Sequence, residues 1–146
     1  MDRLQIGAHL LALATAFALA MPIGWDREKK ARSAGLRTFP LVALASCGFI
    51  QASESLLADS PEGMSKVIEG LITGIGFIGG GAILKQGTTV LGTATAASLW
   101  ATGAIGVSVG LGAFDVAVTV AAFTFLTLRL LPLVKDEDSE TAPKKD

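Results

Sequence analysis

The sequence predicts an all-α fold: a polytopic membrane protein built as a bundle of about five transmembrane helices with glycine-rich close packing. Three observations favour this class. The chain of 146 residues is 51% hydrophobic with a mean hydropathy of +0.56, and its charges gather in a few clusters between long apolar runs. Those runs reach about 20 residues, the length that a helix needs to cross a bilayer. Twelve of the 17 glycines fall within residues 70–112, where small residues would let membrane helices approach closely.

Five apolar segments are long enough to span a membrane. His9 is the strongly polar residue of the first, Glu54 lies toward the end of the second, and Glu69 lies near the start of the third. Gly112 and Ala113 alone separate the last two segments, which predicts a tight helical hairpin. The predicted spans are residues 4–23, 36–57, 67–84, 94–111 and 114–131.

The domain organisation follows from these spans. A chain of 146 residues has the length of one domain, so a single transmembrane domain is predicted over residues 1–134. A short glycine-containing link is expected between the third and fourth helices. Residues 135–146 read KDEDSETAPKKD and lack large apolar side chains, so we expect a disordered, solubilising tail.

Lys and Arg are unequally divided between the two sides of the predicted bundle. Ten lie in or beside the first loop, after the third span, and at or beyond the end of the fifth, whereas the other side holds Arg3 and Lys66. Because basic loops stay cytoplasmic, we expect the N-terminus outside, and the first loop and C-terminus in the cytoplasm. Residues 18–20 also resemble a signal-peptide cleavage site, but cleavage would leave the basic loop outside.

Composition excludes several classes of protein. The net charge of −1 gives no general attraction to nucleic acid. Cys47 is the single cysteine, which excludes an internal disulfide and a cysteine-based metal site, and we expect it to be a small packed residue. No nucleophile–base pairing, zinc-ligand spacing or phosphate loop stands out in the sequence. We therefore expect no enzyme activity and no resident cofactor.

Glycines recur at four-residue intervals in the third and fourth predicted helices. Pairs such as Gly76 and Gly80 fit the spacing of close helix–helix contacts in membranes. The surface that these glycines form either contacts another membrane protein or is buried in contacts between helices of the same chain. The glycines expected to pack helices are Gly70, Gly74, Gly76, Gly80, Gly81, Gly103, Gly106 and Gly110.

The basic first loop is the strongest candidate functional region. Asp26 and Arg27 lie where the first span leaves the membrane, and Arg37 and Thr38 lie where the second enters it. A carboxylate and two guanidinium groups can pair across such a loop, and Arg suits bidentate contacts with carboxylate or phosphate. The alternative, favoured for Lys29, Lys30 and Arg32, is that basic residues set the topology and contact lipid headgroups.

Glu69 belongs to a polar stripe on the third predicted helix. Positions 69, 73, 76 and 80 share one face of a helix, and this stripe carries Glu69, Thr73 and two glycines. An acidic group in a membrane helix is a functional hypothesis by default, so Glu69 is the candidate metal ligand. Because it lies about one turn from the predicted interface, simple solvation there is the alternative.

Thr95, Ser98 and Thr102 share one face of the fourth predicted helix. Their hydroxyls can coordinate a dehydrated ion, or they can hydrogen-bond across to the third helix at on the order of 0.6 kcal/mol per bond. The second interpretation is favoured. Trp100, on the same helix, is expected to be a packing residue that faces lipid.

Two other polar residues have plainer explanations. Asp115 opens the fifth predicted helix, where the helix dipole stabilises an anion. His9 stands alone in an apolar helix, and a metal site needs several convergent ligands. We therefore expect His9 to be an interior or interfacial group.

Three sequence blocks follow one another in a specific order. The first is GWDR at 24–27 with AGLRT at 34–38, the second is GIGFIGGG at 74–81 followed by ILK, and the third is TAASLWAT at 95–102 followed by AIG. Together they resemble the MgtC/SapB family, over about residues 7–131. The chain departs from the family at Asp26, where the family usually has Glu, at Phe39, where it often has His, and at 92–95, where GTAT replaces Gly-Leu-Thr-Thr. It looks like the stand-alone form, without the soluble C-terminal domain of some members.

The resemblance implies a multi-pass protein of the bacterial inner membrane, linked to survival in low magnesium and to growth inside macrophages. Three functions follow as hypotheses. The first is a regulatory membrane protein that acts through helix–helix contact with a membrane partner or as a homo-oligomer. The second is an oligomeric transporter of magnesium or another ion, with Mg²⁺ as ligand or signal, although the acidic residues of the spans lie toward the outer side. The third is a structural or lipid-organising protein of the bilayer.

Overall fold

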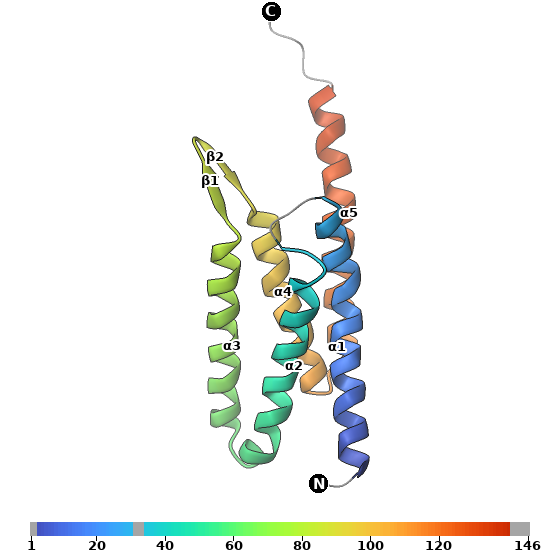
Figure 1. The fold of residues 1–146 in the computed structure, drawn as a ribbon, viewed down its shortest axis with the longest axis vertical. Coiled ribbons are helices and arrows are strands. Elements are labelled where there is room, and N and C mark those ends of the chain that lie inside the picture. Colours follow the sequence, from blue (N-terminus) through green and yellow to red (C-terminus); the bar gives the residue numbers. More distant parts are fainter. Residues whose placement is uncertain (1–2, 31–33, 141–146) are drawn as a thin grey trace, which may run out of the picture.

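The computed structural model describes residues 3–30 and 34–140. The described part contains α1 (Arg3–Lys29), α2 (Thr38–Leu57), α3 (Pro61–Gly81), β1 (Leu84–Gln86), β2 (Thr89–Leu91), α4 (Thr93–Gly110) and α5 (Phe114–Glu140). The fold is therefore all-α with one small hairpin. The helices run alternately up and down the long axis, so that α1, α3 and α5 end at the same end as the hairpin (Figure 1).

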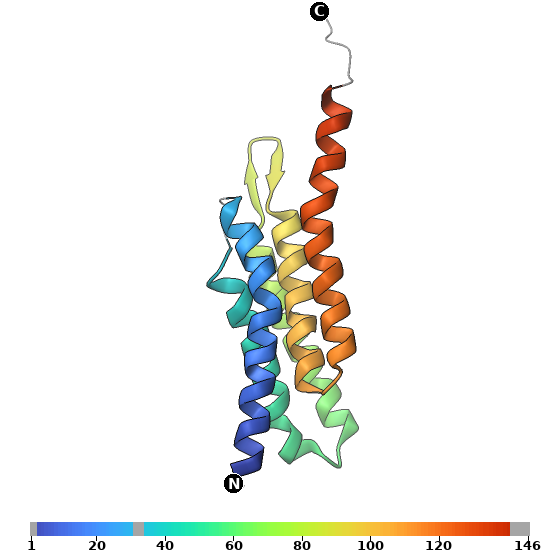
Figure 2. The same cartoon turned by 90° about the vertical axis from the view of Figure 1, so that its right-hand side faces the viewer.

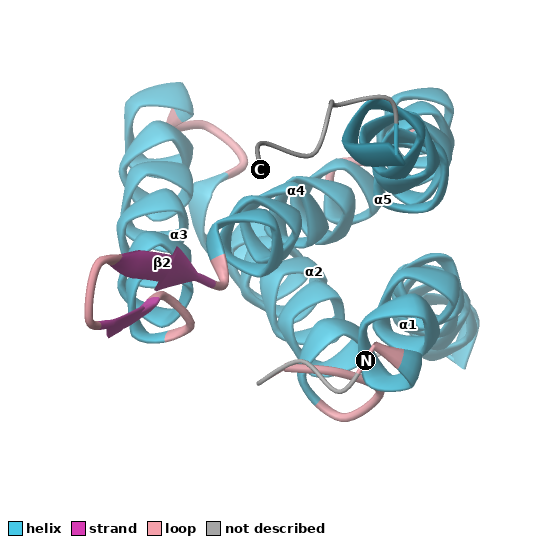
Figure 3. Ribbon diagram, turned by 90° about the horizontal axis from the view of Figure 1, so that it is seen from above, coloured by secondary structure: helices cyan, strands magenta, loops and turns pink. Residues whose placement is uncertain are grey.

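The helix α4 lies at the centre of the bundle. It packs against each of the other four helices, whereas α3 packs at the edge against α2 and α4 (Figure 3). In the side view, α1, α4 and α5 stand next to one another, and α5 rises past the hairpin (Figure 2). Much of the core consists of alanines, and Ile23, Phe39, Leu99 and Ile105 are its large fully buried side chains. The small core residues explain how five helices pack closely around one another.

The helix α3 begins at Pro61, six residues before the predicted start at Val67. Ser60 is the N-cap, and its Oγ accepts a hydrogen bond from the Gly63 N–H at 3.1 Å. Proline at the first helical position and Glu62 in the first turn complete a strong helix-start signal. The helix thus extends six residues ahead of the predicted span, because hydropathy follows apolar side chains while the cap determines where the helix begins.

The third helix also ends ahead of residue 84, where the predicted span ends. Helix α3 stops at Gly81, and Leu84 pairs with Leu91 in the antiparallel hairpin of β1 and β2. Gly87 has a φ of 61° in the two-residue loop of this hairpin, a conformation that such tight turns favour. The expected short link between the third and fourth helices is therefore a β-hairpin.

The tight turn predicted between α4 and α5 is confirmed. Gly112 has a φ of 75°, and its N–H donates to the Val109 carbonyl at 3.0 Å. The N–H of Ala113 donates to the Ser108 carbonyl at 2.8 Å. These two bonds form a Schellman motif, in which a left-handed glycine satisfies the last carbonyls of the helix.

The helix α5 continues to Glu140 and so includes residues 135–140, part of the tail for which the sequence predicts disorder. No glycine or proline follows Pro132 within this part of the sequence, and Lys and Glu are good helix formers. Extending an existing helix also avoids the cost of nucleating a new one. Residues 141–146 of the predicted tail lie outside the described residues.

Two described helices have the length and composition of membrane spans, over Ile6–Lys29 and Phe114–Leu131. Only 22% and 17% of these windows are buried, so most of their apolar surface points outward. Large apolar side chains on other helices are exposed as well: Leu56 is 83% and Phe77 is 85% exposed. Extensive apolar surface of this kind marks contact with a membrane or a partner.

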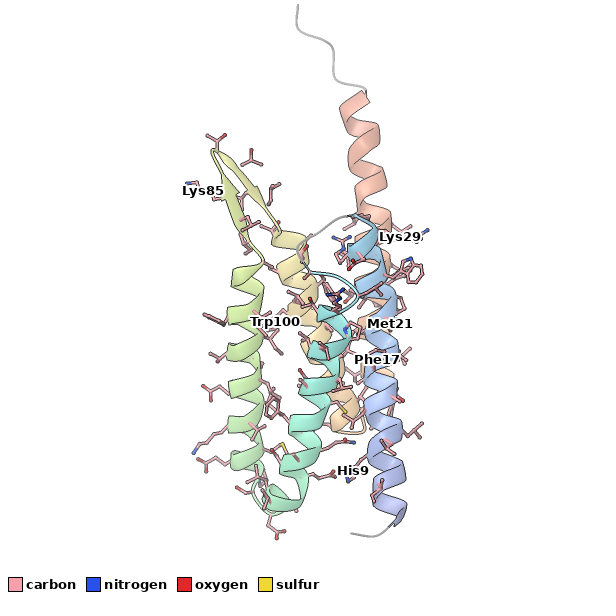
Figure 4. All side chains as sticks on the ribbon, viewed as in Figure 1. His9, Phe17, Met21, Lys29, Lys85 and Trp100 are labelled. Carbon is pink, nitrogen blue, oxygen red and sulfur yellow. The ribbon has the colours of Figure 1, made fainter. Side chains whose placement is uncertain are left out.

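The two ends of the bundle differ in charge. Lys29 and Lys85 lie at the hairpin end, whereas His9 lies toward the opposite end (Figure 4). The junction of α1 and α2 brings further cations, Arg27, Lys30 and Arg37, to the hairpin end. Acidic residues lie at or near the opposite end: Glu54, Asp59, Glu62 and Asp115.

Candidate functional site

A buried ion-pair cluster closes the hairpin end of α1. This cluster, here called the clasp, consists of Asp26, Arg27 and Lys30. Arg27 donates to Asp26 Oδ2 from Nη2 and, at 3.1 Å, from Nε, while Lys30 Nζ lies 3.2 Å from Asp26 Oδ1. Asp26 is 6% and Arg27 4% exposed. The carboxylate is thus bonded on both oxygens, as a buried charge requires.

The clasp also joins α1 to α5. Lys30 Nζ donates to the Leu128 carbonyl oxygen at 2.9 Å, and Arg27 Nη2 approaches the same oxygen at 3.5 Å. In a regular helix this carbonyl would accept from the residue four positions later, but that residue is Pro132, which has no N–H. The cations of α1 therefore satisfy a carbonyl that the proline leaves without its helical donor.

The loop that enters α2 folds back on α1. Leu36 N–H donates to Glu28 Oε2 at 3.0 Å, and the Gly35 carbonyl accepts from Thr38 N at 3.0 Å and Phe39 N at 3.2 Å. A Cβ at Gly35 would overlap Glu28 Oε2. Glycine at this position lets the loop approach the helix, and fully buried Phe39 anchors the start of α2.

The predicted pairing of Asp26 with Arg37 across the loop is not met. Asp26 bonds to Arg27 and Lys30 in the described structure, while Arg37 is exposed at the N-cap of α2. For Lys30 the sequence favours a role in topology and headgroup contact, but in the structure it pairs with Asp26. Its spacing of four residues from Asp26 is the sequence signal that could have revealed the pair, because α1 continues as a helix to Lys29.

Arg37 and Thr38 lie instead at one end of a groove between α2 and α3. The groove has a volume of about 650 Å³ and is almost entirely apolar. Its lining residues are Arg37, Thr38, Leu41, Val42, Ala45, Ser46, Phe49, Val67, Gly70, Leu71, Gly74, Ile75 and Ile78. A smaller pocket of about 150 Å³ lies on the other side of α3, against α4.

The glycines of α4 face close neighbours. A Cβ at Gly106 would overlap the Ala43 carbonyl oxygen of α2 and lie 2.8 Å from Ser46 Cβ. At Gly110 it would lie 2.7 Å from Ile50 Cβ, and at Gly103 it would overlap the end of the Ile75 side chain of α3. Gly106 and Gly110 accept no side chain without movement of α2, whereas at Gly103 the Ile75 side chain would have to shift.

The glycines of α3 contrast with those of α4. Gly79 is buried, and its Cβ would lie 3.4 Å from the Ala96 carbonyl. At Gly63, in the first turn, a Cβ would lie 2.9 Å from Leu57 Cδ2 and from Ser60 Oγ, whereas around five further glycines no described atom lies within 4 Å of the Cβ position. These open glycines are Gly70, Gly74, Gly76, Gly80 and Gly81.

Two of the predicted hydroxyls bond within their own helix. Ser98 Oγ donates to the Thr95 carbonyl at 2.9 Å, and Thr102 Oγ1 donates to the Ser98 carbonyl at 2.8 Å. All three side chains are buried, at 1%, 3% and 0% exposure for Thr95, Ser98 and Thr102. The expected bonds from Ser98 and Thr102 across to the third helix are therefore replaced by local ones, which every Ser or Thr in a helix can make.

Glu69 lies farther along its helix than the sequence suggested. It follows Pro61 by eight residues, about 12 Å at 1.5 Å per residue. Its side chain is exposed, and its carbonyl accepts from Thr73 Oγ1 at 2.9 Å. Glu69, Thr73, Gly76 and Gly80 form one exposed row, here called the outer stripe of α3, on the side of the helix away from the α2–α3 groove.

The remaining predicted residues occupy ordinary positions. Cys47 is fully buried, as expected, and Trp100 is 53% exposed. Asp115 lies in the first turn of α5, and His9 is half-buried. Among the described residues, no three His, Cys, Asp or Glu side chains gather as metal ligands would.

A family model described as the MgtC family matches residues 13–136. The chain belongs to the MgtC family. Its relatives include Protein MgtC of Salmonella typhimurium, 40% identical over 113 residues, which cover 77% of this chain and 48% of that protein. Protein MgtC of Brucella abortus is 41% identical over 130 residues, 88% of this chain and 54% of the relative. An uncharacterised protein of Synechocystis sp. is 41% identical over 109 residues, 75% and 46% of the two chains.

MgtC family proteins are membrane proteins, in agreement with the two apolar helices described above. The chain spans about half the length of the curated relatives it matches. No solved structure matches the chain. The family match covers the clasp, the α2–α3 groove and the outer stripe of α3, so all three lie in the shared part of these proteins.

Proposed function

We propose that the chain is a regulatory membrane protein of the bacterial inner membrane, linked to magnesium limitation or stress adaptation. It acts through helix–helix contact between the outer stripe of α3 and a membrane partner, either another protein or a second copy. The observation that carries the proposal is the open space over Gly76 and Gly80, where a Cβ meets no described atom within 4 Å. The link to magnesium rests on the names of the relatives.

The chemistry of the outer stripe supports a partner helix. Small residues let membrane helices approach closely, since lipid gives no hydrophobic drive to associate. Thr73 Oγ1 is already bonded to the Glu69 carbonyl, so the stripe presents little that projects beyond the backbone. Glu69 is exposed beside it, and a carboxylate in a membrane gains from a polar group on the partner.

The proposed topology has five spans, with the N-terminus outside and the first loop and C-terminus in the cytoplasm. The alternating helices support it, because they gather Lys29, Arg37 and Lys85 at one end of the bundle. Basic residues near the ends of spans favour the cytoplasmic side. The outer stripe of α3 then faces the bilayer.

The test compares two leucine variants of α3. Tagged chains are extracted from native membranes in mild detergent, and co-purifying membrane proteins and dimers are quantified. Gly76→Leu places a side chain on the outer stripe and is expected to lower the partner yield about tenfold, a loss of 1.4 kcal/mol in binding. Gly74→Leu, on the opposite side of α3, is the matched control and should retain the partner. Equal yields from wild type and Gly76→Leu would contradict the proposal.

Ion transport is the competing function, with Glu69 as the ligand. Purified wild type in proteoliposomes is compared with Glu69→Gln for magnesium flux. The regulatory proposal expects no flux from either protein, with correct insertion checked by protease protection of the tail. Flux from wild type that disappears in Glu69→Gln would establish a transporter and place Glu69 on its path.

A further inference from the structure

Two open glycines hollow out the groove between α2 and α3. Gly70 and Gly74 line it, and a Cβ at either position would meet no described atom within 4 Å. The spacing of these glycines suits close helix contact, but here they leave empty volume of about 650 Å³. Leu41, Phe49 and Ile78 supply apolar walls.

The length of the groove matches a single hydrocarbon chain of one leaflet. From Thr38 to Phe49 the wall of α2 covers twelve residues, and the rise from the first to the last is about 17 Å at 1.5 Å per residue. That length is close to one leaflet, half of a hydrocarbon core about 30 Å thick.

The groove has one charged end. Arg37 lies there with Thr38, it is exposed, and the ion pairs of the described residues involve Arg27, Lys30 and Lys66 instead. The N–H groups of Thr38 and Phe39 are already bonded to the Gly35 carbonyl. The group that is free to bind an anion at this end is therefore the guanidinium.

We propose that the groove holds an acyl chain of an anionic phospholipid whose phosphate lies at Arg37. An apolar channel of leaflet length that ends in one cation is complementary to such a lipid, and Arg suits phosphate. Anionic lipids are enriched in the cytoplasmic leaflet, the side assigned to the hairpin end. This site is separate from the outer stripe of α3, and it rests on the proposed topology but not on the proposed contact with a partner.

The experiment is native mass spectrometry of the full chain, released from nanodiscs that contain phosphatidylglycerol and phosphatidylcholine with identical acyl chains. Wild type is expected to retain one phosphatidylglycerol per chain in preference to phosphatidylcholine. Gly74→Leu fills the groove and should lower retention of both lipids about tenfold, whereas Gly76→Leu, on the other side of α3, should retain them. Gly70→Leu repeats the block at a second position if Gly74→Leu does not give a folded monomer.

The headgroup is tested separately. Arg37→Gln should reduce the preference for phosphatidylglycerol about fivefold, in line with one basic group at an anionic membrane surface. Lys85→Gln, in the hairpin at the same end, is the matched control and should leave the preference unchanged. Wild-type retention by both groove variants would overturn the proposal. The proposal would also be overturned if wild type formed a dimer and Gly74→Leu lost the dimer but kept its lipid. That result would mean that a second copy of the chain occupies the groove.

Discussion

Helices α3 and α4 are similarly rich in glycine, but they use it differently. On α4, Gly106 and Gly110 lie against the backbone and side chains of α2, so a methyl group at either position would overlap or crowd its neighbour. On α3, Gly76 and Gly80 have open space around them within the described structure. Glycine spacing therefore indicates where a close approach is possible, and only the rotation of the helix shows whether the neighbour belongs to the same chain.

The two helices also differ in how they are supported. α4 packs against four helices, and the clasp ties α1 to α5 beside it. α3 packs against α2 and α4 and has a pocket on each side. The region around α4 thus has the properties of a scaffold, while α3 leaves more of its surface uncovered by the described residues.

The largest expected effect is on the scaffold side of this comparison. Asp26→Asn removes the charge that pairs with Arg27 and Lys30 and leaves a buried guanidinium without its carboxylate. Breaking a buried pair in this way costs about 3–5 kcal/mol, which thermal unfolding in detergent will measure. Glu62→Gln is the control, because its pair with Lys66 is exposed and should contribute little. Equal effects of the two substitutions would mean that the clasp does not hold the scaffold.

The next largest effect is expected from a single methyl group added to α4. Gly106→Ala should lower the free energy of unfolding by about 1–3 kcal/mol, because its methyl overlaps the Ala43 carbonyl, a backbone atom with little freedom to move. The midpoint of thermal unfolding reports this loss. A stable Gly106→Ala protein would show that α2 and α4 are not in the close contact described here.

Much of the fold could be predicted from the sequence, because long apolar runs and the Gly112 turn are local signals. Helix α3 begins ahead of the predicted span because Ser60, Pro61 and Glu62 form a helix-start signal, whereas the span follows hydropathy alone. The hairpin was missed for a similar reason. Gly87 lies in a short polar segment that was interpreted as a plain link.

The candidate site was less predictable because it depends on which helices are neighbours. The carbonyl of Leu128 is 98 residues from Lys30 in the chain, and nothing in the local sequence links the two. The lack of a donor at Pro132 shows that a carbonyl is free, but not what satisfies it. In the same way, the sequence does not determine that Gly74 lines a groove while Gly106 meets a carbonyl, since both have similar surroundings in the sequence.

A smaller effect is expected on the local unfolding of α3, and it shows whether α3 unfolds independently of α4. Ser60→Ala removes the N-cap bond to Gly63 and should cost about 1 kcal/mol. Ser65→Ala is the control, since its hydroxyl bonds to a carbonyl of the first turn and caps no N–H group. Hydrogen exchange should quicken at the start of α3 and remain slow in α4. Equal acceleration in both helices would show that α3 and α4 open as one unit.

The smallest effect on stability is expected at the outer stripe. Gly76→Ala meets no described atom within 4 Å, so it should leave stability unchanged or raise it by at most about 1 kcal/mol through helix propensity. Thermal unfolding of the purified monomer checks this. A loss as large as that of Gly106→Ala would mean that Gly76 has a neighbour within the chain and would remove the contrast between the helices.

The central claim, that the outer stripe of α3 is a protein-contacting surface, is tested most directly by crosslinking in native membranes. Single cysteines are placed along α3 in a Cys47→Ser background and modified with a photoreactive maleimide. The account predicts protein adducts from positions 69, 73, 76 and 80, with lipid adducts from 70 and 74. Protein adducts of equal yield around the whole helix, or none from the outer stripe, would contradict it.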